Sequence, residues 1–298
     1  MAHTLEQLTR QEQTLTSIRS VVRTMKTLAA INATPYERAA SAIEGHRRTV
    51  RHGFAAFAYR MGGQIVVDEL AVQRQVLVAF GSDHGFCGNY NEAVARVAER
   101  RLADGSTRPT TVLCIGAKLE AALAERGIAV DQRLTPPASV DGIGRLASRI
   151  VSQLERLARG LPLLSLTVDL IHTRRLERGE RGVVTVPLLP LERSLLQAPK
   201  PWPGRALPDF SMAPTALLAA LLRSHLFASV FHASAEAMVT ENAARLALMQ
   251  QAEQSVDERL DAVRRQASGV RQDQVTEELM DIVIGHFEAS TRAKKTAR

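Results

Sequence analysis

The chain has 298 residues, of which 45% are hydrophobic and 23% are charged, and these proportions exclude a disordered or collagen-like protein. Only 4% of the residues are aromatic, so the core has to be built from aliphatic side chains and alanine. No run of eighteen apolar residues appears, and the first residues lack the basic-then-apolar order of a signal peptide. We therefore expect a cytosolic chain in which Cys87 and Cys114 are thiols.

The formal net charge is +7, and its distribution along the chain decides what it means. Residues 1–60 hold nine basic and four acidic side chains, whereas residues 210–298 hold ten basic and eleven acidic ones. A basic first segment is compatible with a nucleic-acid clamp, which a steep salt dependence of DNA binding would support. No aromatic residues alternate with the basic ones as stacking platforms, so we predict no nucleic-acid partner.

Residues 1–60 are predicted to form one long helix. Apolar side chains mark one seam of it, at Leu8, Leu15, Ile18, Val22, Met25 and Ala29, and the last five are spaced three, four, three and four residues apart. This is the period of a coiled coil, in which a helix packs its apolar seam against another helix. An interior proline costs a helix about 3 kcal/mol, so we expect a kink or a break at Pro35.

Residues 65–208 are predicted to form an α/β domain. Apolar runs at 75–80, 110–115, 128–134, 164–173 and 182–188 are typical of strands, and the segments 92–103, 118–126 and 142–159 are typical of helices. Strands that alternate with helices of this length form a mainly parallel sheet covered by helices. The fold class is therefore α/β, with a Rossmann-like domain inserted between the two helices of a long antiparallel coiled coil.

The segment Gly81–Gly88 follows the first predicted strand and precedes a helix, which is where a doubly wound sheet places a phosphate loop. It contains neither GxGxxG nor GxxxxGK[ST], so we predict no nucleotide cofactor. Asp83, His84 and Cys87 resemble an acid, a base and a nucleophile, but such triads are usually assembled from distant segments. We predict no catalytic residue here, and the spacing of the eight histidines predicts no metal site.

The same segment is better explained as a structural turn made by Asp83, Gly85, Cys87 and Gly88. The two glycines permit positive φ in a tight strand-to-helix turn. We expect Phe86 and Cys87 to pack beneath it.

Residues 210–290 are predicted to form a second long helix, followed by a basic tail at 291–298. Its seam keeps the heptad register at Leu246, Met249, Val256, Leu260, Val263, Ala267 and Val270, with Glu253 at one seam position, and resumes after a one-residue slip at Val275, Leu279 and Ile282. At 1.5 Å per residue this helix could run roughly 120 Å, far more than the diameter of a domain of this mass. The first helix is too short to cover it, so the surplus seam needs another protein; a plain dimerising coiled coil is the alternative.

Several segments together resemble one family, the γ subunit or central stalk of F-type ATP synthases. Residues 21–30 read VVRTMKTLAA, similar to the family's ITKAMxMVAA, and the turn SDHGFCG followed by Asn91 resembles its [ST]DRGLCGxxN signature. Residues 241–249 read ENAARLALM, similar to EHAARMxAM, and residues 271–283 read RQDQVTEELMDIV, similar to RQxxITxELxEIV. Departures at Asn32, Pro35, His84 and Asn89, together with the basic tail, indicate a divergent bacterial member.

The resemblance implies a non-catalytic rotor shaft, without a cofactor or a direct small-molecule substrate. The shaft would stand inside the ring of α and β subunits and bear on the ε subunit and the c-subunit membrane ring, at the cytoplasmic face of the bacterial plasma membrane. By position in the family's motifs, the residues that contact the ring are Arg23 and Met25 on the first helix, and Arg271, Gln272 and Thr276 on the last. The competing class is an autonomous Rossmann-like enzyme with dimerising helical arms.

Overall fold

The structure is a computed structural model that describes residues 2–62, 74–103, 109–158, 163–176, 180–198, 202 and 206–296; the side chains of residues 2–3 and 285–296 are not described. It divides into two compact units, one made of residues 1–27 and 247–298 and the other of residues 28–246. The expected domain boundaries at 60/65 and 208/210 stay predictions, and residue 65 lies outside the described residues. Residues 297–298 of the basic tail and the side chains of residues 291–296 also lie outside the described part of the chain.

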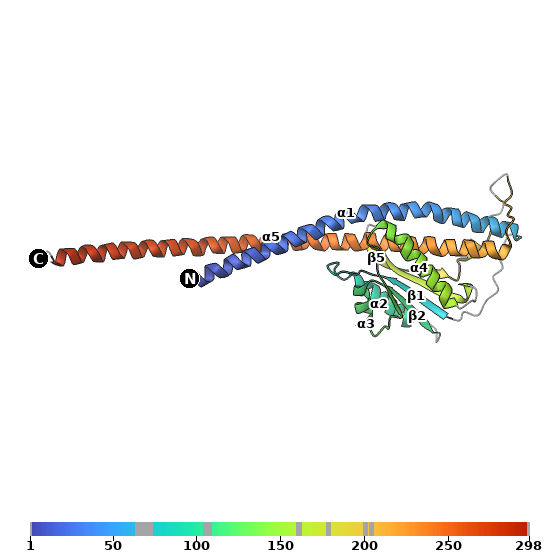
Figure 1. The fold of residues 1–298 in the computed structure, drawn as a ribbon, viewed down its shortest axis with the longest axis horizontal. Helices are drawn as coiled ribbons and strands as arrows, with labels where there is room; N and C mark the ends of the chain where they lie inside the picture. The colour runs from blue at the N-terminus through green and yellow to red at the C-terminus, as the bar shows by residue number, and fades with distance from the viewer. Residues whose placement is uncertain are drawn as a thin grey trace. The chain divides into compact units, whose positions relative to one another are not determined.

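Two long helices dominate the secondary structure (Figure 1). Helix α1 spans Ala2–Arg60 and helix α5 spans Pro214–Thr296. The proline that opens α5 suits the first helical position, where its missing N–H would have no partner and its φ is already helical. The helix predicted at 210–290 thus begins four residues later and continues six residues further.

Of the kink or break expected in the first helix at Pro35, the break is wrong, and the kink stays a prediction. Helix α1 continues through Pro35 without interruption. Both Pro35 and Ile31, whose carbonyl loses its helical partner there, are exposed. Water can therefore solvate the freed carbonyl, which keeps the cost of the missing hydrogen bond low.

A five-stranded sheet in the order β3-β2-β1-β4-β5 forms the centre of the second unit. Its strands are β1 Arg74–Phe80, β2 Thr110–Ile115, β3 Gln132–Leu134, β4 Leu166–Arg175 and β5 Arg181–Leu189. Strands β1 to β4 pair in parallel, and β5 pairs antiparallel with β4. This confirms the α/β fold class with a mainly parallel sheet, although the strand expected at 128–134 is reduced to three residues.

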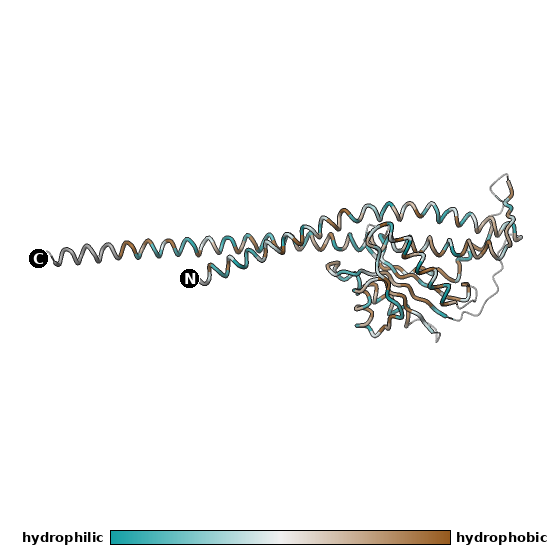
Figure 2. Tube along the Cα trace, viewed as in Figure 1, coloured by the Kyte–Doolittle hydropathy of each residue, from teal (hydrophilic) through white to brown (hydrophobic). Residues whose placement is uncertain are grey.

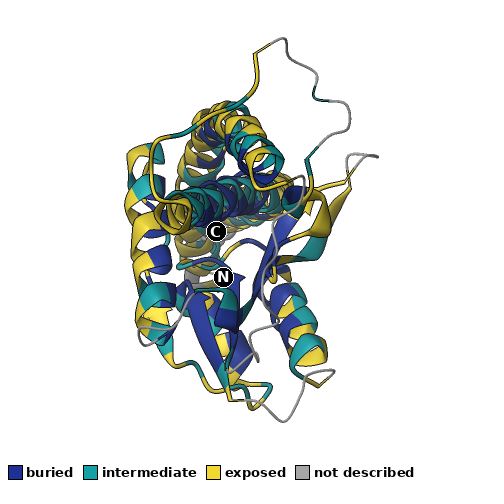
Figure 3. Cartoon of the chain, turned by 90° about the vertical axis from the view of Figure 1, so that its right-hand side faces the viewer, coloured by how far each residue is buried: buried dark blue, intermediate teal, exposed yellow. Residues whose placement is uncertain are grey.

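Helices cover both faces of the sheet. One face packs on α2 Tyr90–Ala103 and α3 Ala117–Ala124, and the other on α4 Val140–Ala158 together with parts of α1 and α5. Alternate residues of β1 serve the two cores: Val76 and Val78 lie in one, Leu77 and Ala79 in the other. Figure 3 shows the strands as buried elements between helices with exposed outer faces, and Figure 2 shows the same strands as mainly hydrophobic.

Part of α5 is long and apolar enough to cross a membrane, judged by length and composition. Within that helix Leu222, Leu226 and Val230 are buried in the core against the sheet and α1. A helix with a buried apolar face of this kind is typical of a folded core. We therefore interpret this stretch as the core helix of the α/β unit.

Candidate partner-binding surfaces

The first compact unit is an antiparallel pair of helical segments, residues 2–27 of α1 and residues 247–296 of α5. Ion pairs join Glu12 to Arg264 at 2.7 Å, Arg19 to Asp257 at 2.6 Å and Arg23 to Glu253 at 2.6 Å. Residue numbers that rise along α1 thus meet numbers that fall along α5. The seam between the segments buries Val22, Met249, Val256, Leu260 and Val263 to 9% exposure or less.

The predicted seam is wrong at Ile18, because the side chain of Ile18 is 44% exposed. Arg19 takes the inward position instead and pairs with Asp257. An α-helix has 3.6 residues per turn and drifts against a strict 3.5-residue period, so the inward face passes from one residue to its neighbour.

Glu253, the polar residue at a seam position, holds two cations of the opposite helix. Its carboxylate accepts hydrogen bonds from Lys26 and Arg23. The hydrogen bond from Lys26, and then that from Arg23, holds the pKa of the Glu253 carboxyl below its ordinary value. The periodicity showed that Glu253 faces the partner helix, but not which side chains it would meet.

The five residues expected to contact a catalytic ring all lie in this first unit. Arg23 is about half exposed, and its Nε donates to Glu253; among the described residues, its other donors have no partner. Met25 is half-buried, whereas Arg271, Gln272 and Thr276 are exposed. The Thr276 hydroxyl donates to the Gln272 backbone carbonyl at 2.9 Å, and within the part of the chain that the structure describes the Gln272 side-chain amide has no partner.

Large apolar side chains are also exposed on α5 between Val275 and Ile284. They are Val275, Leu279, Met280, Ile282, Val283 and Ile284, each 49% to 68% exposed. Val275, Leu279 and Ile282 were expected to continue the seam. They are exposed because the amino-terminal end of α1 does not reach far enough along α5 to cover them. An exposed apolar cluster of this kind is typical of an interaction surface.

The turn after β1 is held by its own side chains. Ser82 N donates to Asn91 Oδ1 at 2.9 Å, and Asn91 Nδ2 donates to the Ser82 hydroxyl at 2.9 Å. Asp83 Oδ1 accepts from Ala117 N at 2.9 Å, where it favours the first turn of α3. Cys87 is buried, and burial raises the pKa of its thiol, which disfavours a nucleophilic thiolate.

Two details of this turn differ from the expectation. Gly88 has a φ of +66°, but the other left-handed residue is Phe86, with a φ of 61°, and not Gly85. Phe86 is also 61% exposed and does not pack beneath the turn. The glycine spacing predicted a turn, but it did not show which residues of the turn would take left-handed backbone angles.

We expect Gly88→Ala to lower the free energy of unfolding by about 1 kcal/mol, because an L-residue in the left-handed region costs about 1–2 kcal/mol. Gly85→Ala is the matched control and should be neutral within about 0.5 kcal/mol, since open space surrounds its Cβ position. Urea unfolding of both variants of the full chain measures the difference. Equal losses in the two variants would contradict this description of the turn.

Two motifs that are far apart in the sequence meet at this turn. Arg245 on α5 places Nη2 at 3.4 Å from the Gly85 carbonyl and at 2.7 Å from Glu241 Oε1. Tyr90, the first residue of α2, donates its hydroxyl to the Ala237 carbonyl at 2.9 Å. The segment 237–245 of α5 is therefore the support on which the turn rests.

Similarities to known proteins agree with this geometry. Residues 4–289 match the family model described as ATP synthase. The ATP synthase gamma chain of Kineococcus radiotolerans is 25% identical over 296 residues and is covered to 96%, as is this chain. The mitochondrial ATP synthase subunit gamma of Drosophila melanogaster is 23% identical over 277 residues, covering 91% of this chain and 86% of its own.

Solved structures share the fold at lower identity. A chain of the Euglena gracilis mitochondrial ATP synthase, from a structure of OSCP, F1 and the c-ring, superposes with a TM-score of 0.60 at 14% identity, covering 99% of this chain and 97% of its own. A chain of the Tetrahymena thermophila central stalk and c-ring has a TM-score of 0.53 at 20% identity, covering 78% of this chain and 99% of its own.

Proposed function

The chain belongs to the ATP synthase family, in which its named relatives are gamma chains, and from this premise we propose that it is the central rotor shaft of an F-type ATP synthase. It couples ion flow through a membrane ring of c subunits to the catalytic sites of the α and β subunits. The ε subunit is a further partner of the α/β unit. The complex is peripheral to the cytoplasmic face of a bacterial plasma membrane.

The exposed segment 271–284 of α5 is the observation that carries this proposal. Its apolar side chains between Val275 and Ile284 have no cover from the first helix, and the polar side chains of Arg271 and Gln272 are exposed next to them. An exposed apolar helix segment that is preceded by exposed polar side chains fits a cavity lined by other subunits. Such a surface would let the shaft stay in contact with the surrounding ring while it rotates against it.

An asymmetric shaft explains how rotation drives catalysis without a catalytic residue of its own. Three chemically identical sites around the shaft make different contacts with it, so each rotor angle favours a different conformation at each site. Rotation then moves nucleotide affinity from site to site through differential contact. The antiparallel pair with its ion pairs and apolar seam provides the stiffness that this coupling needs.

The contacts with the ring are assigned to Met25, which is apolar, and to the polar residues Arg23, Arg271, Gln272 and Thr276. The free guanidinium donors of Arg23 and Arg271 suit bidentate pairing with acidic loops of the catalytic subunits. The Gln272 amide suits a hydrogen bond that forms at one rotor angle and is released at another. Arg23 can make such a contact without leaving Glu253, because a guanidinium has five N–H donors.

The arrangement of the turn after β1 does not favour the autonomous enzyme. A doubly wound domain binds its phosphate at this position, through free backbone N–H groups. Here the Ser82 N–H is bonded to Asn91, and Arg245 contacts the Gly85 carbonyl.

Co-purification with α and β subunits of the same bacterium tests the proposed function. We expect the tagged full chain to recover both subunits in an ATP-hydrolysing complex, and to hydrolyse no ATP alone. A chain that ends at Val270 is the control, because it lacks the exposed part of α5 and should recover much less of both. A homodimer that retains no α or β subunit would contradict the proposal.

A further inference from the structure

Two hollows meet over the outer face of helix α4 in the second compact unit. One, of about 580 Å³, lies between α4 and the edge strand β3, and the other, of about 520 Å³, lies between α4 and α5. Ser148, Ser152 and Glu155 line both. We call the two hollows together the α4 groove.

The α4 groove carries an excess of positive charge. Arg149, Arg156 and Arg223 line it with a single acid, Glu155. Arg223 Nε donates to Glu155 Oε1 at 2.7 Å, so the carboxylate is already neutralised by an arginine. Within the described part of the chain no hydrogen bond or ion pair engages the Arg149 or Arg156 side chain, so two guanidinium groups are available to a ligand.

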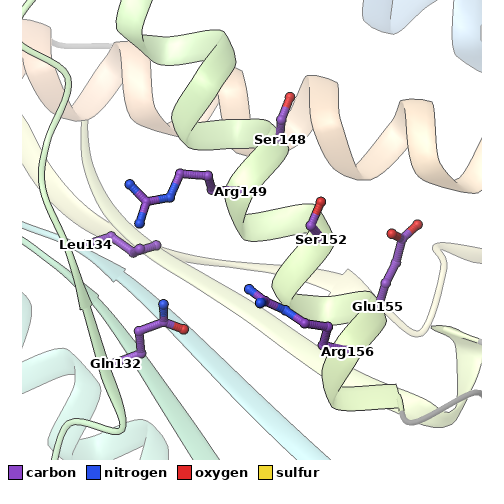
Figure 4. A pocket seen from close by; sticks show the side chains of 7 residues that line it. All are labelled: Gln132, Leu134, Ser148, Arg149, Ser152, Glu155 and Arg156. Carbon is purple, nitrogen blue, oxygen red and sulfur yellow. The ribbon is translucent and has the colours of Figure 1, made fainter.

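These two guanidinium groups point in one direction. In Figure 4 Arg149 and Arg156 extend from α4 toward the strand that carries Gln132 and Leu134, while Ser148 and Ser152 point to the other side. Their positions are seven residues apart, about 10.5 Å along the helix at 1.5 Å per residue. Strand β3 is an edge of the sheet, so one side of its backbone faces no other described strand.

The openness of the groove indicates the kind of occupant. Arg149, Arg156, Ser148 and Ser152 are all exposed, so a small anion bound here would keep most of its surface in water. Small-molecule sites bury most of their ligand, whereas protein interfaces are broad and enriched in arginine. The two separated cations and the small serines fit an acidic segment that lies along the groove.

We propose that the α4 groove docks an acidic segment of a partner subunit in the assembled ATP synthase. The inference rests on the proposed function, since it needs an assembled complex. Beyond the proposed function, it identifies a binding surface on the α/β unit and predicts that the segment covering it is acidic. The residues of this surface are Arg149, Arg156, Ser152 and Gln132.

Thiol labelling in the complex tests this docking. The native Cys87 and Cys114 are buried, so a Ser152→Cys variant carries a uniquely accessible thiol in the groove among described residues. We expect maleimide to label it at least tenfold more slowly in the purified complex than in the isolated chain. Arg96→Cys, at an exposed position of α2, is the matched control and should label equally fast in both. Equal labelling at position 152 in both forms, or equal protection at both positions, would overturn the docking.

Charge reversal tests the acidity of the partner segment. Adding Arg149→Glu and Arg156→Glu to the Ser152→Cys chain should restore fast labelling in the complex, whereas Arg96→Glu with Arg100→Glu, the same change of charge on α2, should not. Restored labelling with both pairs, or with neither, contradicts an acidic occupant. Slow labelling of the isolated chain in 1 mM pyrophosphate would instead indicate a small-anion site and overturn the proposal.

The proposed function and the docking of the α4 groove can fail separately. If the chain recovers no α or β subunit, the proposed function is wrong. If the complex assembles and labelling at position 152 stays fast, the docking inference alone is wrong.

Discussion

Replacing Arg245 with alanine should lower the free energy of unfolding of the full chain by about 3 kcal/mol. The change leaves the buried Glu241 carboxylate, 6% exposed, without the guanidinium that lies 2.7 Å away. It also removes the contact with the Gly85 carbonyl that ties α5 to the turn. Breaking a buried pair by removing one partner is costly, because the remaining charge is desolvated and unpaired. Urea unfolding followed by circular dichroism measures the loss.

The matched control is Arg264→Ala, which removes an arginine from an exposed pair with Glu12. Side chains that are 52% and 34% exposed are screened by solvent, so this loss should stay within about 1 kcal/mol. Similar losses in both variants would show that the Arg245 pair has no special role.

The loss caused by Arg245→Ala should also depend on pH. Burial raises the pKa of the Glu241 carboxyl, and Arg245 opposes that shift, so the variant has the higher pKa. A carboxyl whose folded pKa is raised holds a proton that the unfolded chain has released, so stability falls as pH rises from the unfolded pKa, about 4.3, through the folded one. We therefore expect a smaller loss at pH 5 than at pH 8. A loss that is equal at both pH values would contradict this account.

Replacing Arg271 and Gln272 together with alanine should lower coupled ATPase turnover of the reconstituted complex about tenfold. Losing a hydrogen bond to a charged group costs about 1.5–3 kcal/mol, and each 1.4 kcal/mol is a factor of ten. Both side chains are exposed, so the variant should fold normally and still assemble. The measurement is ion pumping and ATP hydrolysis by complexes with equal subunit content.

The chain offers a closely matched control six residues earlier on the same helix. Arg265 and Gln266 form the same dipeptide and are also exposed, so their double alanine variant removes the same side chains from a different position. We expect its turnover to stay within about twofold of the unmodified complex. Equal rates for both double variants would refute the assignment of Arg271 and Gln272 to the ring contact.

Local pattern was sufficient to predict most elements of this protein. The heptad positions Val256, Leu260 and Val263 are buried as expected, because apolar side chains at that period have to share one face of a helix. The strand order could not be predicted in the same way, since it depends on which edges meet in space. Ile18 was misplaced by one residue because helical drift depends on the length over which two helices stay in contact.

The candidate surfaces could likewise be predicted from the sequence only in part. The spacing of Arg149 and Arg156 already places them on one face of a helix, but the strand opposite them and the neutralised Glu155 emerge from the tertiary structure. The support of the turn by Arg245 joins residues separated by 160 positions. No local signal encodes such a pairing.

The sequence by itself determined the two long helices, the inserted α/β unit and the family, because periodicity and short motifs are properties of neighbouring residues. The tertiary structure decided which side chains are paired and which are left for partners. That distinction depends on burial and on contacts between distant segments. Arg23 and Arg271 look alike in the sequence, yet Arg23 is bonded to Glu253 while Arg271 lies exposed beside the exposed apolar residues 275–284 of α5.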